Sequence, residues 1–230
     1  SPGVNPGEEF LPTVEAMAES YLRLIEPLLD GPLVLTGLSY GGLVAYEMGR
    51  RLAEAGNRQV SVLLLDTQGT DDPVERAEIE PVDLPEFRDK LIKFNGMYPG
   101  IEDAQIEQYF HIYNHNRLTM RDYLTPPSSA RLVLLQAVAN RDDESVRQAL
   151  EFWGRRARNA PGGLTVEVVR CDHWEILESD EVRGVAGLIG RELDCLSEPG
   201  SPGQAGSVSS DSAGPADSAE PVLSDSAPRP

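Results

Sequence analysis

The sequence has only two cysteines, Cys171 and Cys195, among 230 residues. Two cysteines are too few for a framework of disulfides, so the sequence favours a reducing compartment. No apolar run approaches the roughly 18 to 20 residues that span a bilayer. The sequence also does not open with the charged and then apolar stretch of a signal peptide. We therefore expect a cytoplasmic protein with no membrane partner.

Positive charge is scarce as well. There are 20 lysines and arginines against 38 acidic residues, which gives a formal net charge of −18 at pH 7. Such an excess of acid repels the phosphates of nucleic acids at long range, so the composition argues against a nucleic-acid partner. Histidine is scarcer still, because only three residues could supply an imidazole.

Large apolar side chains are almost missing from residues 197–230, which consist mainly of Ser, Pro, Gly, Ala and Asp. A segment of this composition cannot bury enough apolar surface to offset its loss of conformational entropy. The sequence therefore predicts a folded domain over 1–196 and a disordered tail over 197–230.

Within the predicted domain, short apolar runs alternate with amphipathic stretches. The runs are PLVLTG at 32–37, VSVLLLD at 60–66, RLVLLQA at 131–137 and LTVEVVR at 164–170. Their continuous apolar character is typical of parallel strands covered on both faces. Thr13 is predicted to cap a first helix, and Gly56 to end a helix over 41–55. This order of elements predicts an α/β fold with a mostly parallel sheet.

The segment 84–124 interrupts the alternation of strands and helices, because no strand is predicted between residues 67 and 130. Its two stretches, LPEFRDKLIKFNGMYPG and IEDAQIEQYFHIYNHNRLTMRDYL, have the pattern of two helices. The simplest position for an inserted pair of helices is above the carboxyl edge of the sheet. We therefore interpret 84–124 as a lid.

The pentapeptide Gly37-Leu38-Ser39-Tyr40-Gly41 matches G-x-S-x-G and lies between a predicted strand and a predicted helix. Such a turn strains its central residue, and bulky side chains at positions 37 and 41 would collide with the flanking elements. The turn exposes the Ser39 hydroxyl beside a helix N-terminus, whose unpaired N–H groups favour an oxyanion. We predict Ser39 as a nucleophile and the backbone N–H of Tyr40 as one oxyanion donor. The alternative is an ordinary glycine-rich turn.

A serine nucleophile needs a base, and the base needs an orienting acid. On α/β-hydrolase scaffolds the chain order is Ser, then Asp or Glu, then His. Asp66 ends the next strand, and His173 follows the last strand in VVRCDHWEIL. We predict Asp66 as the acid and His173 as the base. The alternatives are an Asp66 that only caps a turn, a structural His173, and an acid at Asp71 or Asp72, which lie farther from the strand end.

Two rival chemistries have weaker support. His111 and His115 lie four residues apart in the second predicted lid helix, a spacing that could bind a metal. No Glu follows His111 as in H-E-x-x-H and no third ligand is evident, so we expect no metal site. Cys171 stands two residues before His173, in or just after a strand, and therefore not on a nucleophile turn.

Several stretches together resemble the thioesterase domains of nonribosomal peptide and polyketide synthases. They are TVEAMAESYLRLI, GPLVLTGLSYGGLVAYEMGRRLAEAGNRQVSVLLLD, FHIYNHNRLTMRDYLTPP and DHWEIL, and the likeness covers about residues 10–190. The resemblance implies an α/β-hydrolase fold with the triad Ser39, Asp66 and His173, and one oxyanion donor at the Tyr40 amide. It also implies release of an acyl or peptidyl chain from the phosphopantetheine of a carrier domain in the same synthase. Release would proceed by hydrolysis or macrocyclisation, with no cofactor bound directly.

Members of that family usually have a further segment before the point where this sequence begins, with a strand and a loop that supply a second oxyanion N–H. We therefore expect N-terminal strands of the fold to be missing from this chain. The alternative is an oxyanion hole that is built differently. Loss of one oxyanion donor costs about 2.7–4 kcal/mol of transition-state stabilisation, so we also expect the chain alone to be weakly active or inactive.

Other functions remain open on the sequence alone. The chain could be a stand-alone type II editing thioesterase, a generic serine esterase, or a hydrolase-fold binding module without catalysis. Carrier domains tend to be acidic, so a basic cluster would have to guide docking to a chain of this charge. Candidates are Arg155, Arg156 and Arg158 in WGRRARN and the pair Arg50-Arg51, although a solvated helix face explains them equally well.

Overall fold

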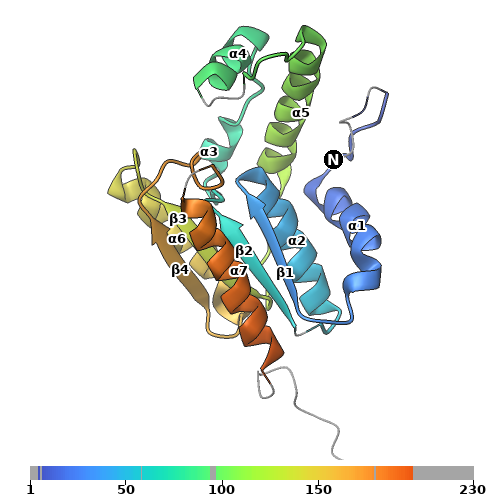
Figure 1. Cartoon of the computed structure of the whole chain (residues 1–230), viewed down its shortest axis with the longest axis vertical. Helices are drawn as coiled ribbons and strands as arrows, with labels where there is room; N and C mark the ends of the chain where they lie inside the picture. Colours follow the sequence, from blue (N-terminus) through green and yellow to red (C-terminus); the bar gives the residue numbers. More distant parts are fainter. Residues whose placement is uncertain (1–4, 6, 58, 94–96, 179, 199–230) are drawn as a thin grey trace, which may run out of the picture.

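The computed structural model describes residues 5, 7–57, 59–93, 97–178 and 180–198, and the chain forms a parallel sheet with helices on both faces (Figure 1). The tail predicted over 197–230 lies outside these ranges, apart from Ser197 and Glu198 at the end of the last helix. No helix in the described ranges is long and apolar enough to cross a bilayer.

Helices and strands alternate along most of the chain. In order the elements are α1 (Val14–Ile25), β1 (Leu33–Leu38), α2 (Tyr40–Glu54), β2 (Val60–Leu65), α3 (Pro73–Ala77), α4 (Leu84–Lys93), α5 (Asp103–Asp122), β3 (Arg131–Ala137), α6 (Asp143–Arg156), β4 (Leu164–Val169) and α7 (Glu181–Ser197). Short 3-10 helices follow α1 at Glu26–Leu28 and α6 at Ala157–Asn159. Each strand lies within one residue of its predicted bounds.

The strands form one sheet in the order β1-β2-β3-β4, and each neighbouring pair is parallel. The predicted parallel α/β sheet is therefore confirmed. Strands β2 and β3 are buried almost throughout, which explains their continuous apolar sequence. The two edge strands differ, because Thr36 in β1 and Val166 and Val168 in β4 are exposed. The expected cover on both faces is wrong for these strands.

Two apolar layers hold the sheet between helices. On one face, α1, α2 and α6 share a cluster that includes Tyr46 and Trp153, whose ring centroids lie 5.1 Å apart. On the other face, α7 packs through Val185 and Leu188. The Trp153 indole N–H also donates to the Thr67 carbonyl at 2.7 Å. Helix α6 therefore fixes the loop that follows β2 at the carboxyl edge of the sheet.

The ends of the first two helices follow the sequence signals. Thr13 accepts a hydrogen bond from the Ala16 N–H at 3.1 Å and so caps α1. Gly56 follows α2 with a φ of 92°. A side chain at this φ would be strained, so glycine lets the chain leave α2 toward β2. Both predicted helix ends are confirmed.

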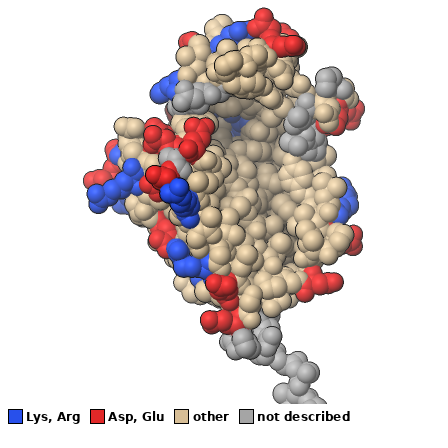
Figure 2. All heavy atoms as spheres, viewed as in Figure 1, with Lys and Arg blue, Asp and Glu red and all other residues tan. Residues whose placement is uncertain are grey.

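Helices α4 and α5 extend beyond the carboxyl ends of the strands (Figure 1). They are held together by a small apolar cluster of their own, in which Phe87 meets Phe110 and Ile106. Figure 2 shows a hollow of mostly uncharged surface below these helices, with acidic and basic side chains gathered on its left side. Two helices in 84–124 match the sequence expectation, and their action as a lid stays a prediction. The sequence did not predict α3.

Candidate active site

The Ser39 turn joins the end of β1 to the start of α2. Ser39 has a φ of 54° and a ψ of −121°, and its N–H donates to the Leu65 carbonyl at 2.9 Å. A positive φ is strained for a residue with a side chain, and such strain persists only where the surroundings impose it. The turn thus has the backbone geometry that the G-x-S-x-G pattern predicts for an outward-facing serine.

Glycines allow the tight packing of this turn, but the collision predicted for side chains at positions 37 and 41 occurs at only one of the two. A Cβ on Gly37 would lie 2.2 Å from the Gly41 carbonyl carbon, and one on Gly42 would lie 1.9 Å from Thr67 Oγ1. A Cβ on Gly41 would meet nothing within 4 Å. The predicted collision at position 41 is therefore wrong. The backbone of Gly41 is what crowds position 37.

Tyr40 connects this turn to two other helices. Its hydroxyl lies 2.7 Å from Thr119 Oγ1 of α5 and 3.2 Å from the Met17 sulfur of α1. Burial raises the pKa of the Tyr40 hydroxyl to about 12, so it stays protonated at neutral pH. The Tyr40 N–H lies in the first helical turn, where no intrahelical partner exists. Among the described residues, no backbone hydrogen bond outside the helices involves this N–H, and its role as an oxyanion donor stays a prediction.

Asp66 follows β2 on the neighbouring strand end and also has a positive φ, of 43°. Its side chain is fully buried. Oδ1 accepts hydrogen bonds from Gln136 Nε2 at 2.6 Å and from the Ala137 N–H at 3.2 Å. Oδ2 lies 2.6 Å from His173 Nδ1. A buried carboxylate with this many donors is held in one orientation.

The structure therefore brings Asp66 and His173 of the predicted triad into direct contact and places Ser39 at the end of the strand next to Asp66. Leu38 and Leu65 are register partners in β1 and β2, so Ser39 and Asp66 follow neighbouring strand positions. His173 reaches Asp66 from the loop after β4. In the described part of the chain, no hydrogen bond joins the Ser39 hydroxyl to His173.

Two polar contacts of Asp66 were not predicted from the sequence. Gln136 lies near the end of β3, and an Arg141 guanidinium nitrogen lies 2.5 Å from Asp66 Oδ2. The only signal for Gln136 was a polar residue in an otherwise apolar, buried strand. Arg141 had none, because it lies in a polar loop 75 positions from Asp66.

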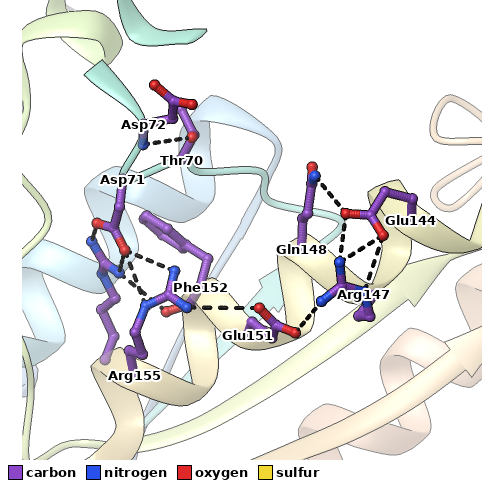
Figure 3. Close-up of polar contacts among 10 residues, drawn as sticks. Thr70, Asp71, Asp72, Glu144, Arg147, Gln148, Glu151, Phe152 and Arg155 are labelled. Carbon is purple, nitrogen blue, oxygen red and sulfur yellow. Dashed lines mark hydrogen bonds and ion pairs between the residues drawn. The ribbon is translucent and has the colours of Figure 1, made fainter. Parts of the chain in front are cut away.

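The other nearby carboxylates serve the fold. Asp72 accepts from the Val74 N–H at 2.7 Å and so caps α3. Asp71 accepts from Arg155 of α6 at 2.8 Å (Figure 3) and from Arg156 at 2.7 Å. These contacts account for Asp71 and Asp72 without a catalytic role, and Asp66 stays the predicted acid at the strand end.

The same contacts change the interpretation of the basic cluster in WGRRARN. Only 8% of Arg156 is exposed, and its guanidinium lies 3.6 Å from the centroid of the Phe152 ring. Arg155 shares the Asp71 carboxylate and lies 4.0 Å from Glu151, so both arginines of the pair have acidic partners within the fold (Figure 3). A solvated helix face is therefore the wrong interpretation for Arg156, and carrier docking at this cluster stays a prediction. The Arg50-Arg51 pair is similarly bound, because both guanidinium groups contact the buried Glu47.

We expect the Asp71 ion pairs to make stability depend on pH in the acid range. Hydrogen bonds from Arg156 and then Arg155 lower the pKa of Asp71 from 3.8 to about 2. The stabilisation is therefore fully present above about pH 4 and is lost as the pH falls toward 2. About half of the Asp71 side chain is exposed, so solvent screening reduces the contribution to about 1 kcal/mol.

Urea unfolding of the wild type and of Asp71→Asn between pH 7 and pH 3 tests this expectation. The variant should be less stable by about 1 kcal/mol at pH 7, and the difference should shrink below about pH 4. A difference that stays constant over this range would contradict the assignment.

The rival chemistries gain no support. His115 Nε2 lies 2.8 Å from the Leu11 carbonyl, and its ring stacks on Phe10. Within the described ranges, no group of three or more His, Cys, Asp or Glu residues could hold a metal ion. Burial, together with the nearby carboxylates of Glu181 and Glu175, raises the pKa of the Cys171 thiol. This environment disfavours the thiolate that a cysteine nucleophile needs.

A cavity of about 260 Å³ adjoins the Asp66 cluster on the side of Arg141. Its lining includes Leu43 of α2, Met120 of α5 and Phe152 of α6, so it lies between the core and the predicted lid. The sequence did not predict these residues as cavity lining, because their apolar character already fits helix packing.

Comparison with protein families gives a match over most of the chain. A family model described as Thioesterase domain matches residues 1–193. The chain is 31% identical over 190 residues to the thioesterase frbE of Dothideomycetidae sp. (strain 11243), covering 80% of this chain and 67% of that protein. It is 36% identical over 103 residues to the non-reducing polyketide synthase ntnG of Nectria sp, covering 44% of this chain.

The chain is much shorter than its synthase relatives. It spans 5% of the Nectria synthase and 3% of malpibaldin synthetase of Mortierella alpina, to which it is 23% identical. The thioesterase frbE is closer to it in length.

Solved structures share the fold. A covalent complex of the NocB thioesterase domain with a fluorophosphonate nocardicin G analog has a TM-score of 0.62 at 24% identity, covering 84% of this chain and 80% of that chain. YbtT, a type II thioesterase from the yersiniabactin pathway, has a TM-score of 0.63 at 20% identity, covering 85% of this chain and 80% of that chain. The parallel sheet and its flanking helices are therefore those of thioesterases of the α/β-hydrolase fold.

Proposed function

Because the chain belongs to the thioesterase domain family, we propose that it releases an acyl or peptidyl chain from the phosphopantetheine arm of a carrier domain. Ser39 is the proposed nucleophile, His173 the base and Asp66 the acid. The observation that carries this proposal is the 2.6 Å contact between His173 Nδ1 and Asp66 Oδ2, beside the strand end where Ser39 turns outward.

In the first half-reaction, Ser39 Oγ attacks the carbonyl carbon of the thioester while His173 Nε2 takes the hydroxyl proton. When the tetrahedral intermediate collapses, the C–S bond breaks. The pantetheine sulfur leaves as a thiol with the proton that His173 returns, and the acyl group stays on Ser39 as an ester.

In the second half-reaction, His173 removes a proton from water or from a hydroxyl or amine of the acyl chain itself. That nucleophile attacks the ester carbonyl, and Ser39 leaves with the proton from His173. Water gives a free acid, and an internal nucleophile gives a lactone or a lactam. Water and the internal nucleophile compete for the ester. A lid that excludes water from the site therefore favours ring closure.

The Tyr40 N–H is the proposed donor to the oxyanion in both half-reactions. Its place in the first turn of α2 adds the positive end of the helix dipole. One well-aimed oxyanion donor is worth about 2.7–4 kcal/mol of transition-state stabilisation. Asp66 holds the Nδ1–H tautomer of His173, so that Nε2 faces the serine. The reaction needs no cofactor bound directly, because the carrier delivers the acyl group already activated.

We propose that the carrier domain belongs to the same synthase chain, as the synthases among the relatives suggest. The alternative is a stand-alone editing thioesterase, supported by the thioesterase frbE, of which this chain covers 67%. A generic serine esterase is a further alternative. A preference for a pantetheine thioester over the matching oxygen ester would argue for either thioesterase and against the esterase.

Serine-directed labelling tests the assignment of the nucleophile. After reaction with an alkyl fluorophosphonate, mass analysis of the digested protein should place the adduct on the peptide that contains Ser39. Ser39→Ala should not be labelled. Ser61 provides a control within the same protein, because it is buried and donates to Glu192 at 2.6 Å. An unlabelled wild type, or an adduct elsewhere, would refute the proposed nucleophile.

Mass analysis of the product from a pantetheine-linked peptide or polyketide then identifies the release step. A product heavier than the ring by one water is the free acid. The ring itself demonstrates cyclisation.

A further inference from the structure

The carboxylate of Asp66 has a second charged partner besides His173. The guanidinium of Arg141 lies 2.5 Å from Oδ2, the same oxygen that faces the imidazole at 2.6 Å. Gln136 and the Ala137 N–H occupy the other oxygen. Two of the other contacts of this carboxylate come from neutral donors, a side-chain amide and a backbone N–H. The third comes from His173, which can act as a base only in its neutral form. Arg141 is thus the permanent positive charge in the cluster.

The loop that carries Arg141 is bonded to the segment that carries His173. Between β3 and α6, the Val138 N–H donates to the Val169 carbonyl at 3.1 Å, and the Ala139 N–H donates to the Cys171 carbonyl at 3.2 Å. Asn140 follows with a φ of 59°. This left-handed residue turns the chain back, so that Arg141 points to the carboxyl edge of β2. The arginine and the histidine therefore reach Asp66 from two loops that are held to each other.

We propose that Arg141 is a positioning residue that holds the Asp66 carboxylate in the orientation His173 requires. The proposal rests on the proposed function, in which Asp66 orients the base. A fully buried carboxylate is costly unless a positive charge and directional donors compensate it. Among the printed contacts of Asp66, the guanidinium of Arg141 supplies this charge permanently. Its planar guanidinium also limits rotation of Oδ2 away from the imidazole.

The cavity next to the cluster makes this role testable by chemical rescue. Arg141 lines the cavity of about 260 Å³, and 22% of its side chain is exposed. Truncation of the side chain to alanine would open this space toward Asp66. A guanidinium ion from solution could then enter and restore the missing partner of Oδ2.

The experiment compares thioester release by the wild type, Arg141→Ala, Arg141→Lys and Arg147→Ala. Groups that orient a catalytic ligand from outside are worth roughly 10–100-fold in metal sites, and we expect a loss of kcat in this range for Arg141→Ala. KM should stay within about twofold, because the residue acts through Asp66 rather than on the substrate. Arg141→Lys should retain part of the rate. Guanidinium or methylguanidinium at millimolar concentration should raise kcat of Arg141→Ala and leave the wild type unchanged.

Arg147→Ala is the matched control. Arg147 lies on α6 and is bound to Glu144 and Glu151 on the outer surface (Figure 3). The substitution Arg147→Ala also removes one arginine, but Arg147 makes no contact with Asp66. Wild-type kcat is expected with and without guanidinium. Equal gains in Arg147→Ala and Arg141→Ala would show that guanidinium acts elsewhere and would overturn the proposal.

Other outcomes separate this proposal from the proposed function. An unchanged kcat in Arg141→Ala overturns the positioning role, as does a raised KM at constant kcat, which would show that Arg141 binds substrate. A loss of kcat without rescue by guanidinium or lysine, together with a lower unfolding temperature, assigns Arg141 to the fold alone. If Arg141→Ala does not fold, Arg141→Lys and Arg141→Gln carry the same comparison. Failure of the wild type to be labelled at Ser39 would instead refute the proposed function.

Discussion

Replacing Asp66 by asparagine should lower kcat for thioester release by about 10⁴ and leave KM within about twofold. Asparagine has nearly the same shape, but its amide cannot balance the positive charge that His173 acquires when it takes the Ser39 proton. Its NH₂ group can also donate to Nδ1, which would turn the imidazole to the tautomer whose Nε2 carries the proton. The base is then lost while the substrate site stays intact.

Asp71→Asn is the matched control for this prediction, because it changes a carboxylate in the same loop. Asp71 contacts Arg155 and Arg156 rather than His173. Steady-state kinetics should therefore give a wild-type kcat for Asp71→Asn, whereas urea unfolding should show a loss of about 1 kcal/mol. Equal loss of kcat in the two variants would show that the loop as a whole, and not the Asp66 contact, governs catalysis.

Alanine at position 37 should abolish phosphonate labelling of Ser39. The added Cβ would lie 2.2 Å from both the carbonyl carbon and the carbonyl oxygen of Gly41, and 2.6 Å from the Gly42 nitrogen. These are backbone atoms at the start of α2, so no side-chain rotation can relieve the contact. The turn must open instead, which moves Ser39 and the Tyr40 N–H together. Overpacking of this kind costs about 1–3 kcal/mol or more, and we expect a loss of stability at the upper end of that range.

Gly41→Ala provides the comparison within the same motif. A Cβ at position 41 would meet nothing within 4 Å. Labelling of Ser39 and the unfolding midpoint should therefore stay near their wild-type values. Gly41 lies inside α2, where alanine favours the helix more than glycine does. Damage by Gly41→Ala equal to that by Gly37→Ala would therefore contradict the steric explanation. The measurements are the rate of phosphonate labelling and the thermal unfolding midpoint of the wild type, Gly37→Ala and Gly41→Ala.

The parts of this fold that could be predicted from the sequence are those coded by neighbouring residues. Apolar runs of strand length predicted the four strands to within one residue, although only β2 and β3 are buried almost throughout. The Thr13 cap, the Gly56 helix end and the Ser39 turn are equally local. Asp66 and His173 could be assigned because the carboxyl ends of parallel strands meet at one edge of a sheet. Their contact agrees with that assignment, and their catalytic roles stay a prediction.

The parts that could not be predicted depend on contacts between distant segments. Arg141 and Gln136 reach Asp66 across 75 and 70 positions. Arg141 has no local pattern that indicates a partner, and the polar Gln136 in an apolar strand does not say which partner it has. Arg156 looked like part of an exposed basic cluster because sequence gives its charge but not its burial against Phe152. The error at Gly41 has the same origin. The motif indicates that the turn is tightly packed, but only the three-dimensional structure shows which glycine has no room for a side chain.

Strand β1, which leads into the Ser39 turn, is an edge strand of the sheet. Among the described residues β2 is its one strand partner, and a cavity of about 370 Å³ lies beside it, lined by Met17, Tyr21 and Leu35 among others. Unpaired N–H and C=O groups next to apolar surface are a template for another extended chain. Concentrated solutions of this polypeptide are therefore expected to lose colloidal stability through edge-to-edge association. Handling it dilute and cold, where apolar association weakens, would protect the preparation.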